Sequence, residues 1–169
     1  MTRPKRARRI GLAPRQDAGQ VQIVARSLFL QAVAHVVPEV LRDLADAPDT
    51  ETARAAWGAR WGLSDRWCLT AAASAQHLWT LLPATRGRRW GPVSGAHWVD
   101  PTVPPHPGLL KHPEHFVWLA RAQCGGVRYA DVGHAVSASP ATVQEACARL
   151  ADLLGLTRRT HGRGRPRVS

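Results

Sequence analysis

Near the end of the chain, apolar residues recur at the spacing of one helix face. A short apolar pattern that begins at Tyr129 precedes a polar turn, and a longer one, from Val143 to Leu154, follows the turn at intervals of three or four residues. In the turn, Ser139 can accept a hydrogen bond from the free amides of the next helix, and Pro140 suits the first helical position, where no N–H is needed. The sequence therefore predicts two short helices across a tight turn.

The first half of the chain opens with a wide apolar stripe over residues 20–45. Pro38 interrupts this stripe, because proline lacks the amide donor that an internal helical position requires. We expect the first helix to end or kink at Val37 and a second helix to start after the proline. A stripe this wide fits either a helix packed on two neighbours or a helix at a dimer interface.

Two further helices are expected before the middle of the chain. Asp49 or Thr50 can cap the first of them, and Gly62 would close it. The second should run over residues 65–82, with Ser64 as its cap and an acidic residue at the positive end of the helix dipole. Tryptophans recur at helical spacing in both helices. This spacing indicates a packed core, in which each indole N–H needs an acceptor, or an aromatic pocket for a small effector.

Prolines and glycines dominate residues 84–113, so this stretch is expected to be an ordered loop or an inter-domain linker. Trp90 and Trp98 lie within it, which indicates that part of the stretch packs against the helical body. Residues 114–124 then predict one more helix, ended by a pair of glycines. This helix would support the two-helix stretch that follows it.

Four histidines gather around the same region, namely His97, His106, His112 and His115. His112 and His115 have a spacing that zinc ligands use, because such ligands often come in pairs two to five residues apart. No pair of cysteines accompanies them. We therefore expect no metal site and no cofactor.

The stretch from Tyr129 onward resembles the helix-turn-helix of bacterial transcription regulators, above all region four of sigma factors and the output domains of response regulators. Gly133 stands where the family keeps a small residue, and Val143 stands at its β-branched position ten residues later. Two positions differ from the family pattern. Ser137 replaces the preferred turn glycine, and Gly133 replaces the usual alanine at a cost of about 1 kcal/mol in helix propensity. The resemblance implies a three-helix domain whose last helix enters the major groove of DNA.

The resemblance also assigns roles to two sets of side chains. The start of the last helix would meet base edges with Ser139, Ala141, Thr142, Gln144 and Glu145. DNA phosphates would be contacted by Arg128, Tyr129, Arg149, Arg158 and Arg159. Only Gln144, which can pair with adenine, and Glu145, which can accept from cytosine, discriminate bases strongly. A monomer would therefore read DNA weakly, and specificity would need a homodimer, a second protein such as RNA polymerase, or the basic tail.

Excess positive charge is confined to the two ends of the chain. Residues 1–16 carry six basic residues and no acid, and residues 157–169 carry five and no acid. Together these equal the formal net charge of +11, so the part between them is formally neutral. A balanced body between two cationic arms indicates a polyanion as partner. A genome that favours arginine codons would explain many arginines, but not their confinement to acid-free ends.

Residues 162–166, GRGRP, resemble the core of an AT-hook. In that motif the glycine lets the backbone lie on the floor of a narrow A·T-rich minor groove, and both arginines exploit the negative potential of the groove. Arg163, Gly164 and Arg165 would therefore contact the minor groove beside the reading helix.

These patterns predict an all-α protein with five parts. A disordered basic arm (1–18) precedes a Trp-rich helical body (19–83), a Pro/Gly-rich loop or linker (84–113), a helix-turn-helix domain (114–156) and a basic AT-hook-like tail (157–169). The sequence leaves open whether the body and the helix-turn-helix share one core.

The expected function is sequence-specific binding of double-stranded DNA by a bacterial or phage transcription regulator that is cytoplasmic and associated with the nucleoid. No Gly-rich phosphate loop, carboxylate cluster or nucleophile motif occurs, so the protein is not expected to be an enzyme. No apolar run is long enough for a membrane span, and three isolated cysteines without a secretion signal indicate a reducing compartment with buried thiols. Two alternatives stay open: a protein–protein adaptor of the transcription or phage machinery that uses the helix-turn-helix as an interaction module, and an RNA-binding protein whose arms order on their ligand.

Overall fold

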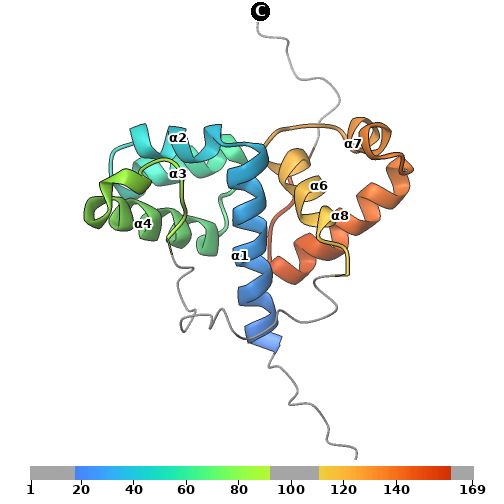
Figure 1. Ribbon diagram of the computed structural model, residues 1–169, viewed down its shortest axis with the longest axis horizontal. Coiled ribbons are helices and arrows are strands. Elements are labelled where there is room, and N and C mark those ends of the chain that lie inside the picture. The colour runs from blue at the N-terminus through green and yellow to red at the C-terminus, as the bar shows by residue number, and fades with distance from the viewer. Residues whose placement is uncertain (1–17, 92–110, 161–169) are drawn as a thin grey trace, which may run out of the picture.

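The computed structural model describes residues 18–91 and 111–160 of the chain (Figure 1). Within these residues it contains seven α-helices, one short 3-10 helix and no strand. In chain order they are α1 (Ala18–Val36), α2 (Glu39–Asp46), α3 (Glu51–Trp61), α4 (Arg66–Leu81), the 3-10 helix η1 (Pro83–Thr85), α6 (Glu114–Gln123), α7 (Tyr129–Val136) and α8 (Pro140–Leu154). The predicted all-α fold class is confirmed.

The first three helices begin and end at the predicted capping and helix-breaking residues. Pro38 separates α1 from α2, and the two helices are bent by 92° at this break. At the start of α3, Thr50 Oγ1 accepts a hydrogen bond from Ala53 N at 3.2 Å. Gly62 ends α3 with a left-handed φ of 71°, a conformation that costs glycine nothing. Local sequence therefore determines where these helices begin and end.

The start of α4 differs from the prediction. The sequence predicts Ser64 as the cap of this helix, but the residue directly before α4 is Asp65, and its side chain makes no cap hydrogen bond. The Asp65 carboxylate instead accepts hydrogen bonds from Thr157, far along the chain. A tertiary contact takes the place of a local cap, and local propensity could not reveal it.

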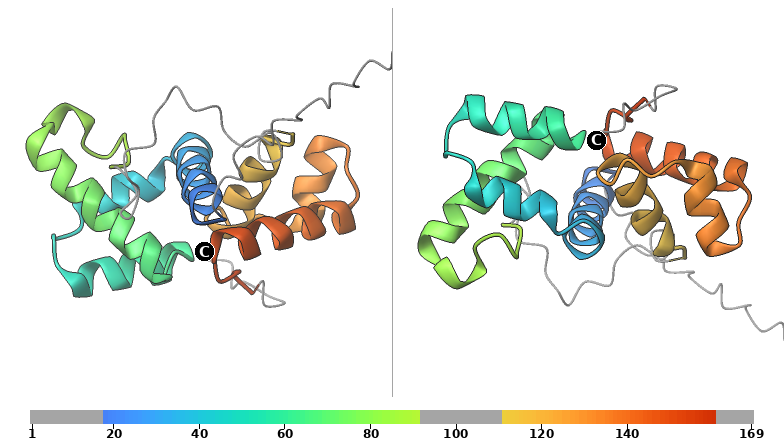
Figure 2. Two further views of the ribbon diagram at one scale, coloured as in Figure 1. Left: turned by 90° about the horizontal axis from the view of Figure 1, so that it is seen from below. Right: turned by 90° about the horizontal axis from the view of Figure 1, so that it is seen from above.

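α1 is the central element of the described fold. α2, α3 and α4 lie on one side of it, and α6, α7 and α8 lie on the other, in all three views (Figures 1 and 2). α1 packs against α6 and α8, and α2 continues from it to meet α3 and α4. The N-terminal helix thereby joins the helical body to the three C-terminal helices.

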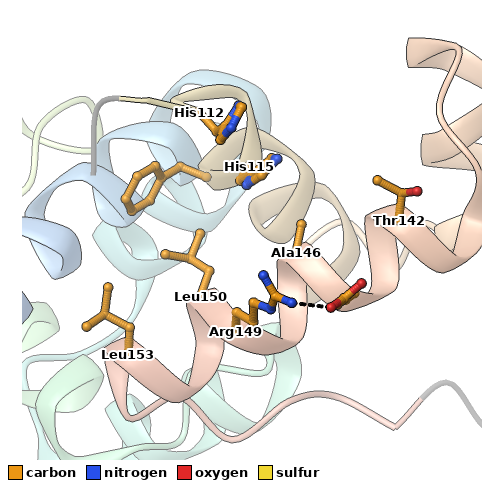
Figure 3. Close-up of a pocket in the computed structure, with 9 residues that line it drawn as sticks. His112, His115, Thr142, Ala146, Arg149, Leu150 and Leu153 are labelled. Atoms are coloured by element: carbon orange, nitrogen blue, oxygen red, sulfur yellow. Dashed lines mark hydrogen bonds and ion pairs between the residues drawn. The ribbon is translucent and has the colours of Figure 1, made fainter. Parts of the chain in front are cut away.

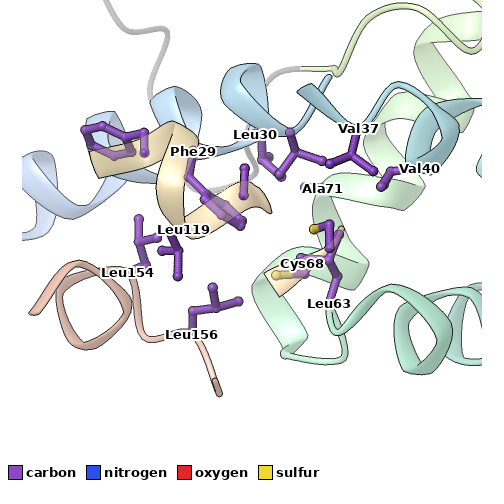
Figure 4. Close-up of a cluster of buried hydrophobic side chains, with 14 of the residues drawn as sticks. Phe29, Leu30, Val37, Val40, Leu63, Cys68, Ala71, Leu119, Leu154 and Leu156 are labelled. Carbon is purple, nitrogen blue, oxygen red and sulfur yellow. The ribbon is translucent and has the colours of Figure 1, made fainter. Parts of the chain in front are cut away.

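One hydrophobic cluster extends through both halves of the molecule (Figure 4). Its members come from α1, from the helical body and from the C-terminal helices, and they include Phe29, Leu30, Val40, Leu63, Ala71, Leu119, Leu154 and Leu156. Burial of apolar surface stabilises a fold by about 25 cal/mol per Å². The body and the C-terminal helices therefore share one core, and each half contributes to the stability of the other.

Tryptophans form part of this core, as the sequence predicts. Trp57 and Trp79 are buried, and their Nε1 atoms donate to backbone carbonyls at 2.9 and 2.8 Å. Trp90 is also buried and meets Trp57 edge-on, with ring centroids 6.1 Å apart. The segment after η1 therefore packs back onto the body, as expected for part of the proline-rich stretch. Trp98 lies outside the described residues.

Trp67 connects the body to the end of α8. Its Nε1 donates to Gly155 O at 3.1 Å, and the Arg26 guanidinium lies over its ring, 4.8 Å from the centroid. Arg26 Nε in turn donates to Leu154 O at 2.9 Å. A helix end leaves carbonyl groups without internal partners, and these donors from α1 and α4 satisfy two of them. The end of α8 is thus fixed by side chains of the first half of the chain.

No single helix in the described part of the chain is both long and apolar enough to cross a membrane. Only α1 and α2 taken together reach that length and composition, with the 92° bend between them.

Candidate functional site

α6, α7 and α8 form a three-helix unit in which α8 packs on both of the other helices. Leu119 of α6, Val132 of α7 and Val143 of α8 are all buried. α6 coincides with the predicted supporting helix, and α7 and α8 with the predicted two-helix stretch. The unit therefore has the helix lengths and the order that the sequence predicts.

The turn between α7 and α8 is tight because Gly133 has no side chain. A Cβ atom on Gly133 would lie 2.6 Å from Ala138 O, which is closer than such atoms approach in proteins. Gly133 O also accepts a hydrogen bond from Ala138 N at 2.9 Å. Ser137, between them, adopts a left-handed conformation with φ 57° and ψ 37°. The resemblance attributes the small residue at position 133 to a close approach of helices, whereas in the structure the backbone of the turn fills the space that a side chain would need.

The start of α8 is capped as predicted. Ser139 Oγ accepts a hydrogen bond from Thr142 N at 3.1 Å and lies 2.8 Å from Thr142 Oγ1. Pro140 occupies the first turn, where its missing N–H leaves no carbonyl unpaired. The backbone of the first turn of α8 is therefore fixed by residues of the turn itself.

The predicted base-reading side chains lie on the open face of α8. All five of them are exposed, namely Ser139, Ala141, Thr142, Gln144 and Glu145. Val143, which lies between Thr142 and Gln144 in the sequence, is fully buried. Glu145 forms an ion pair with Arg149 one turn later, and both side chains are exposed. A solvent-exposed pair of this spacing contributes only about 0.3–0.5 kcal/mol, so a ligand can replace it at little cost. The first two turns of α8 thus present one polar edge to solvent.

Three of the predicted phosphate contacts come together beside the unit. Tyr129, Arg158 and Arg159 line an open cavity of about 570 Å³. Desolvation raises the pKa of the half-buried Tyr129 hydroxyl, although Arg158 opposes the shift. Arg128 is exposed and pairs with Asp131 at 3.0 Å. Cationic and hydroxyl donors of this kind are typical partners of phosphate oxygens.

Arg159 has a structural role that the sequence does not reveal. Its guanidinium donates to Arg60 O at 3.1 Å and to Gln123 O at 3.5 Å, and its backbone N donates to Gln123 Oε1 at 3.0 Å. These acceptors belong to the ends of α3 and α6, which lie far from position 159 in sequence. Arg159 therefore holds the chain that leaves α8 against the rest of the fold, and it is only half-exposed.

No family model, no curated protein and no solved structure matches this chain. The helix-turn-helix resemblance therefore stays a prediction based on the residues themselves. The predicted minor-groove residues Arg163, Gly164 and Arg165 lie outside the described residues, as does the basic arm up to residue 17.

A second group of polar side chains gathers where α6 begins. The imidazoles of His112 and His115 and the carboxylate of Glu114 offer ligand atoms that all lie within 4.8 Å of one another. Desolvation lowers the pKa of His115, and the neighbouring His112 lowers it further. A backbone hydrogen bond at the helix start lowers the pKa of Glu114, with help from His112. The spacing of the two histidines suggests cysteines as further zinc ligands, whereas the group that lies beside them is the Glu114 carboxylate.

The three cysteines are buried and carry free thiols, as the sequence predicts. Desolvation raises the pKa of Cys124 to about 12 and that of Cys147 to about 12. Desolvation, with a further contribution from Asp65, raises the pKa of Cys68 as well. A thiol is nucleophilic only as a thiolate, so none of these cysteines is suited to chemistry at neutral pH.

Proposed function

We propose that this protein binds double-stranded DNA in a sequence-dependent manner and acts as a transcription regulator of bacterial or phage type. The observation that carries the proposal is the polar edge of α8, where five side chains are exposed at the start of a helix whose other face is buried. The major groove admits an α-helix, and the N-terminal residues of such a helix reach the base edges. The positive end of the helix dipole also favours an anionic partner at this end of α8.

The side chains on this edge have the chemistry that base recognition requires. The Gln144 amide can donate to and accept from adenine, and the Glu145 carboxylate can accept from the amino group of cytosine. The Ala141 methyl group can pack against the methyl group of thymine. When Glu145 turns to a base, Arg149 is released from its ion pair and becomes available to a phosphate.

Contacts to phosphate would set the register of α8 on the duplex. Arg128, Tyr129 and Arg158 supply donors near the start of α7 and the end of the described chain, and the acid-free termini add further charge. Two strongly discriminating side chains read only a few bases. We therefore propose that further contacts, made by a second copy of the chain, by RNA polymerase or by the basic tail, supply the remaining sequence specificity. The place of action would be the nucleoid.

The test begins with selection of bound duplexes from a random library, followed by mobility shifts of the selected duplex over a range of salt concentrations. Each phosphate neutralised by the protein should contribute about −0.9 to the slope of log affinity against log salt. Absence of duplex binding at low salt would reject the proposal. A preference for structured RNA over duplex DNA would reject it in favour of an RNA-binding function.

A double variant, Gln144→Ala with Glu145→Ala, should lose the preference for the selected duplex by about 1–3 kcal/mol per base contact while it keeps its non-specific affinity. The matched control is Gln31→Ala with Glu51→Ala, which removes an exposed amide and an exposed carboxylate from α1 and α3. This control should bind as the unmodified protein does. If the Gln144 and Glu145 variant keeps its full preference, α8 serves as a protein interaction surface instead.

A further inference from the structure

Three side chains of metal-binding type lie together where α6 begins. His112 lies two residues before the helix, and Glu114 and His115 are its first two residues. His112 Nδ1 lies 3.1 Å from Glu114 Oε1, and the His112 and His115 rings stack with centroids 4.8 Å apart. His115 also packs against the Trp118 ring, with centroids 4.7 Å apart, so its imidazole is held between His112 and the body of α6.

The ligand atoms lie close to the separations that one shared ion requires. Zinc binds imidazole nitrogen and carboxylate oxygen at about 2.0–2.2 Å. The ligand atoms of the three residues already lie within 4.8 Å of one another, and His112 and Glu114 are exposed. Two ligand atoms of one ion lie at most about 4.4 Å apart at these bond lengths, so the exposed side chains must draw slightly closer together to share an ion.

The cluster borders a cavity of about 360 Å³ between the start of α6 and the outer face of α8 (Figure 3). His112 and His115 lie on the α6 side of this cavity, and Arg149, Leu150 and Leu153 lie on the α8 side. In this structure Arg149 is paired with Glu145, which offsets its charge at the other wall. An ion held at the cluster would keep part of its coordination sphere open toward this cavity.

We propose that His112, Glu114 and His115 bind one divalent transition-metal ion of the zinc class. Two imidazoles and one carboxylate are ligands that suit Zn²⁺, Co²⁺ and Ni²⁺, whereas Mg²⁺ and Ca²⁺ prefer oxygen ligands alone. Three protein ligands with an open position are the arrangement that zinc adopts where a further molecule can join it. The proposal does not rest on DNA binding by α8, although Thr142, Glu145 and Arg149 line the same cavity.

The test is calorimetric titration of the full chain, first stripped of metal with a chelator, with Zn²⁺ in a buffer that does not bind metals. One ion per chain should bind. His112→Ala, Glu114→Gln and His115→Ala should each weaken binding by at least about tenfold, because changes to residues that merely orient a ligand already cost about 10–100-fold. Co²⁺ should give visible absorption bands that the His115→Ala variant lacks.

The matched controls are His77→Ala and His134→Ala, which remove exposed imidazoles from α4 and α7. Both should bind Zn²⁺ with unchanged affinity. The double variant His112→Ala with His115→Ala retains the histidines at positions 97, 106 and 161, so binding through those residues would persist in it. Persistence of one-to-one binding in a folded double variant, judged by circular dichroism, or absence of binding by the unmodified chain, would overturn the proposal.

Discussion

Asp65 and Thr157 join the helical body to the chain that leaves α8. The Asp65 carboxylate accepts one hydrogen bond from Thr157 N at 2.7 Å and another from Thr157 Oγ1 at 2.8 Å. Asp65 directly precedes α4, and Thr157 lies three residues beyond the last residue of α8. A charged acceptor with two donors makes a strong hydrogen-bonding unit. This pair therefore fixes where the basic tail departs from the fold.

Replacement of Asp65 by alanine should lower the free energy of unfolding. Hydrogen bonds to a charged group contribute about 1.5–3 kcal/mol each, and the partial exposure of Asp65 reduces this, so we expect a loss of about 2 kcal/mol in urea denaturation. Asp46→Ala is the control, because Asp46 is an exposed acid at the end of α2 and should change stability by less than about 0.5 kcal/mol. Equal effects of the two substitutions would refute the role of the Asp65–Thr157 pair.

Gln123 should matter for stability more than an ordinary polar residue. Its side chain is only 2% exposed; its Nε2 donates to Gly62 O and Thr157 O, and its Oε1 accepts from Arg159 N. Leucine has a similar volume but satisfies none of these groups. Because unsatisfied buried polar groups cost about 1–3 kcal/mol, Gln123→Leu should lower the free energy of unfolding by about 2–3 kcal/mol. Gln144→Leu, at an exposed site on α8, is the control and should leave stability nearly unchanged.

Two substitutions at the turn between α7 and α8 should change the free energy of unfolding in opposite directions. Gly133→Ala adds a Cβ atom 2.6 Å from Ala138 O and should destabilise the protein by more than 1 kcal/mol, although alanine has the higher helix propensity. Ser137→Gly removes the cost of a left-handed serine and should stabilise the protein by up to about 1 kcal/mol. Thermal unfolding of both variants measures the two effects.

The control for this pair is Ala135→Gly, at an exposed position of α7. It should lose about 0.5–1 kcal/mol through helix propensity alone. If Gly133→Ala raises the melting temperature, as it would at an open helical site, then the turn is looser than the geometry indicates.

The buried thiols predict slow cysteine chemistry and a fall in stability at alkaline pH. Burial raises the pKa of Cys124 and Cys147 to about 12, whereas the thiol of an unfolded cysteine titrates with a pKa of about 8.5. As the pH rises, the unfolded chain therefore loses its thiol protons at a lower pH than the folded protein does. The free energy of unfolding should decrease as the pH rises above about 8.5. At pH 8 an aromatic disulfide reagent should label the folded protein slowly and all three cysteines quickly in urea. Rapid labelling of the folded protein would contradict the buried placement.

The sequence predicts best what is decided within a few neighbouring residues. Pro38 breaks a helix, Thr50 caps one and Pro140 starts one, because each acts through its own backbone or through an amide three residues away. The exposure of Gln144 follows in the same way from helical period, once Val143 is placed inward.

What the sequence does not predict depends on residues that meet only in the folded chain. The Asp65 side chain accepts a hydrogen bond from Thr157 and makes no cap hydrogen bond to α4. Arg159 donates to the carbonyls of Arg60 and Gln123. No local pattern indicates either contact. The shared core is predicted in part, because the wide apolar stripe of α1 fits a helix packed on two neighbours, but the sequence does not say which helices those neighbours are. The cluster at the start of α6 is intermediate, because its ligands are neighbours in the sequence His-Pro-Glu-His, but only the fold brings their ligand atoms within 4.8 Å of one another.

Substitutions of Arg158 and Arg159 should separate the effect on DNA binding from the effect on stability. This prediction rests on the proposed function. Arg158 is exposed, so Arg158→Ala should weaken binding to all duplexes alike and reduce the magnitude of the salt slope by about 0.9, with the unfolding free energy unchanged. Arg159→Ala removes donors from the ends of α3 and α6 and should also lower the unfolding free energy, by about 1–2 kcal/mol. Mobility shifts over a salt series and urea denaturation of both variants measure the two effects. If Arg158→Ala leaves the slope unchanged while Arg159→Ala lowers only stability, the cavity beside Tyr129 does not contact phosphate.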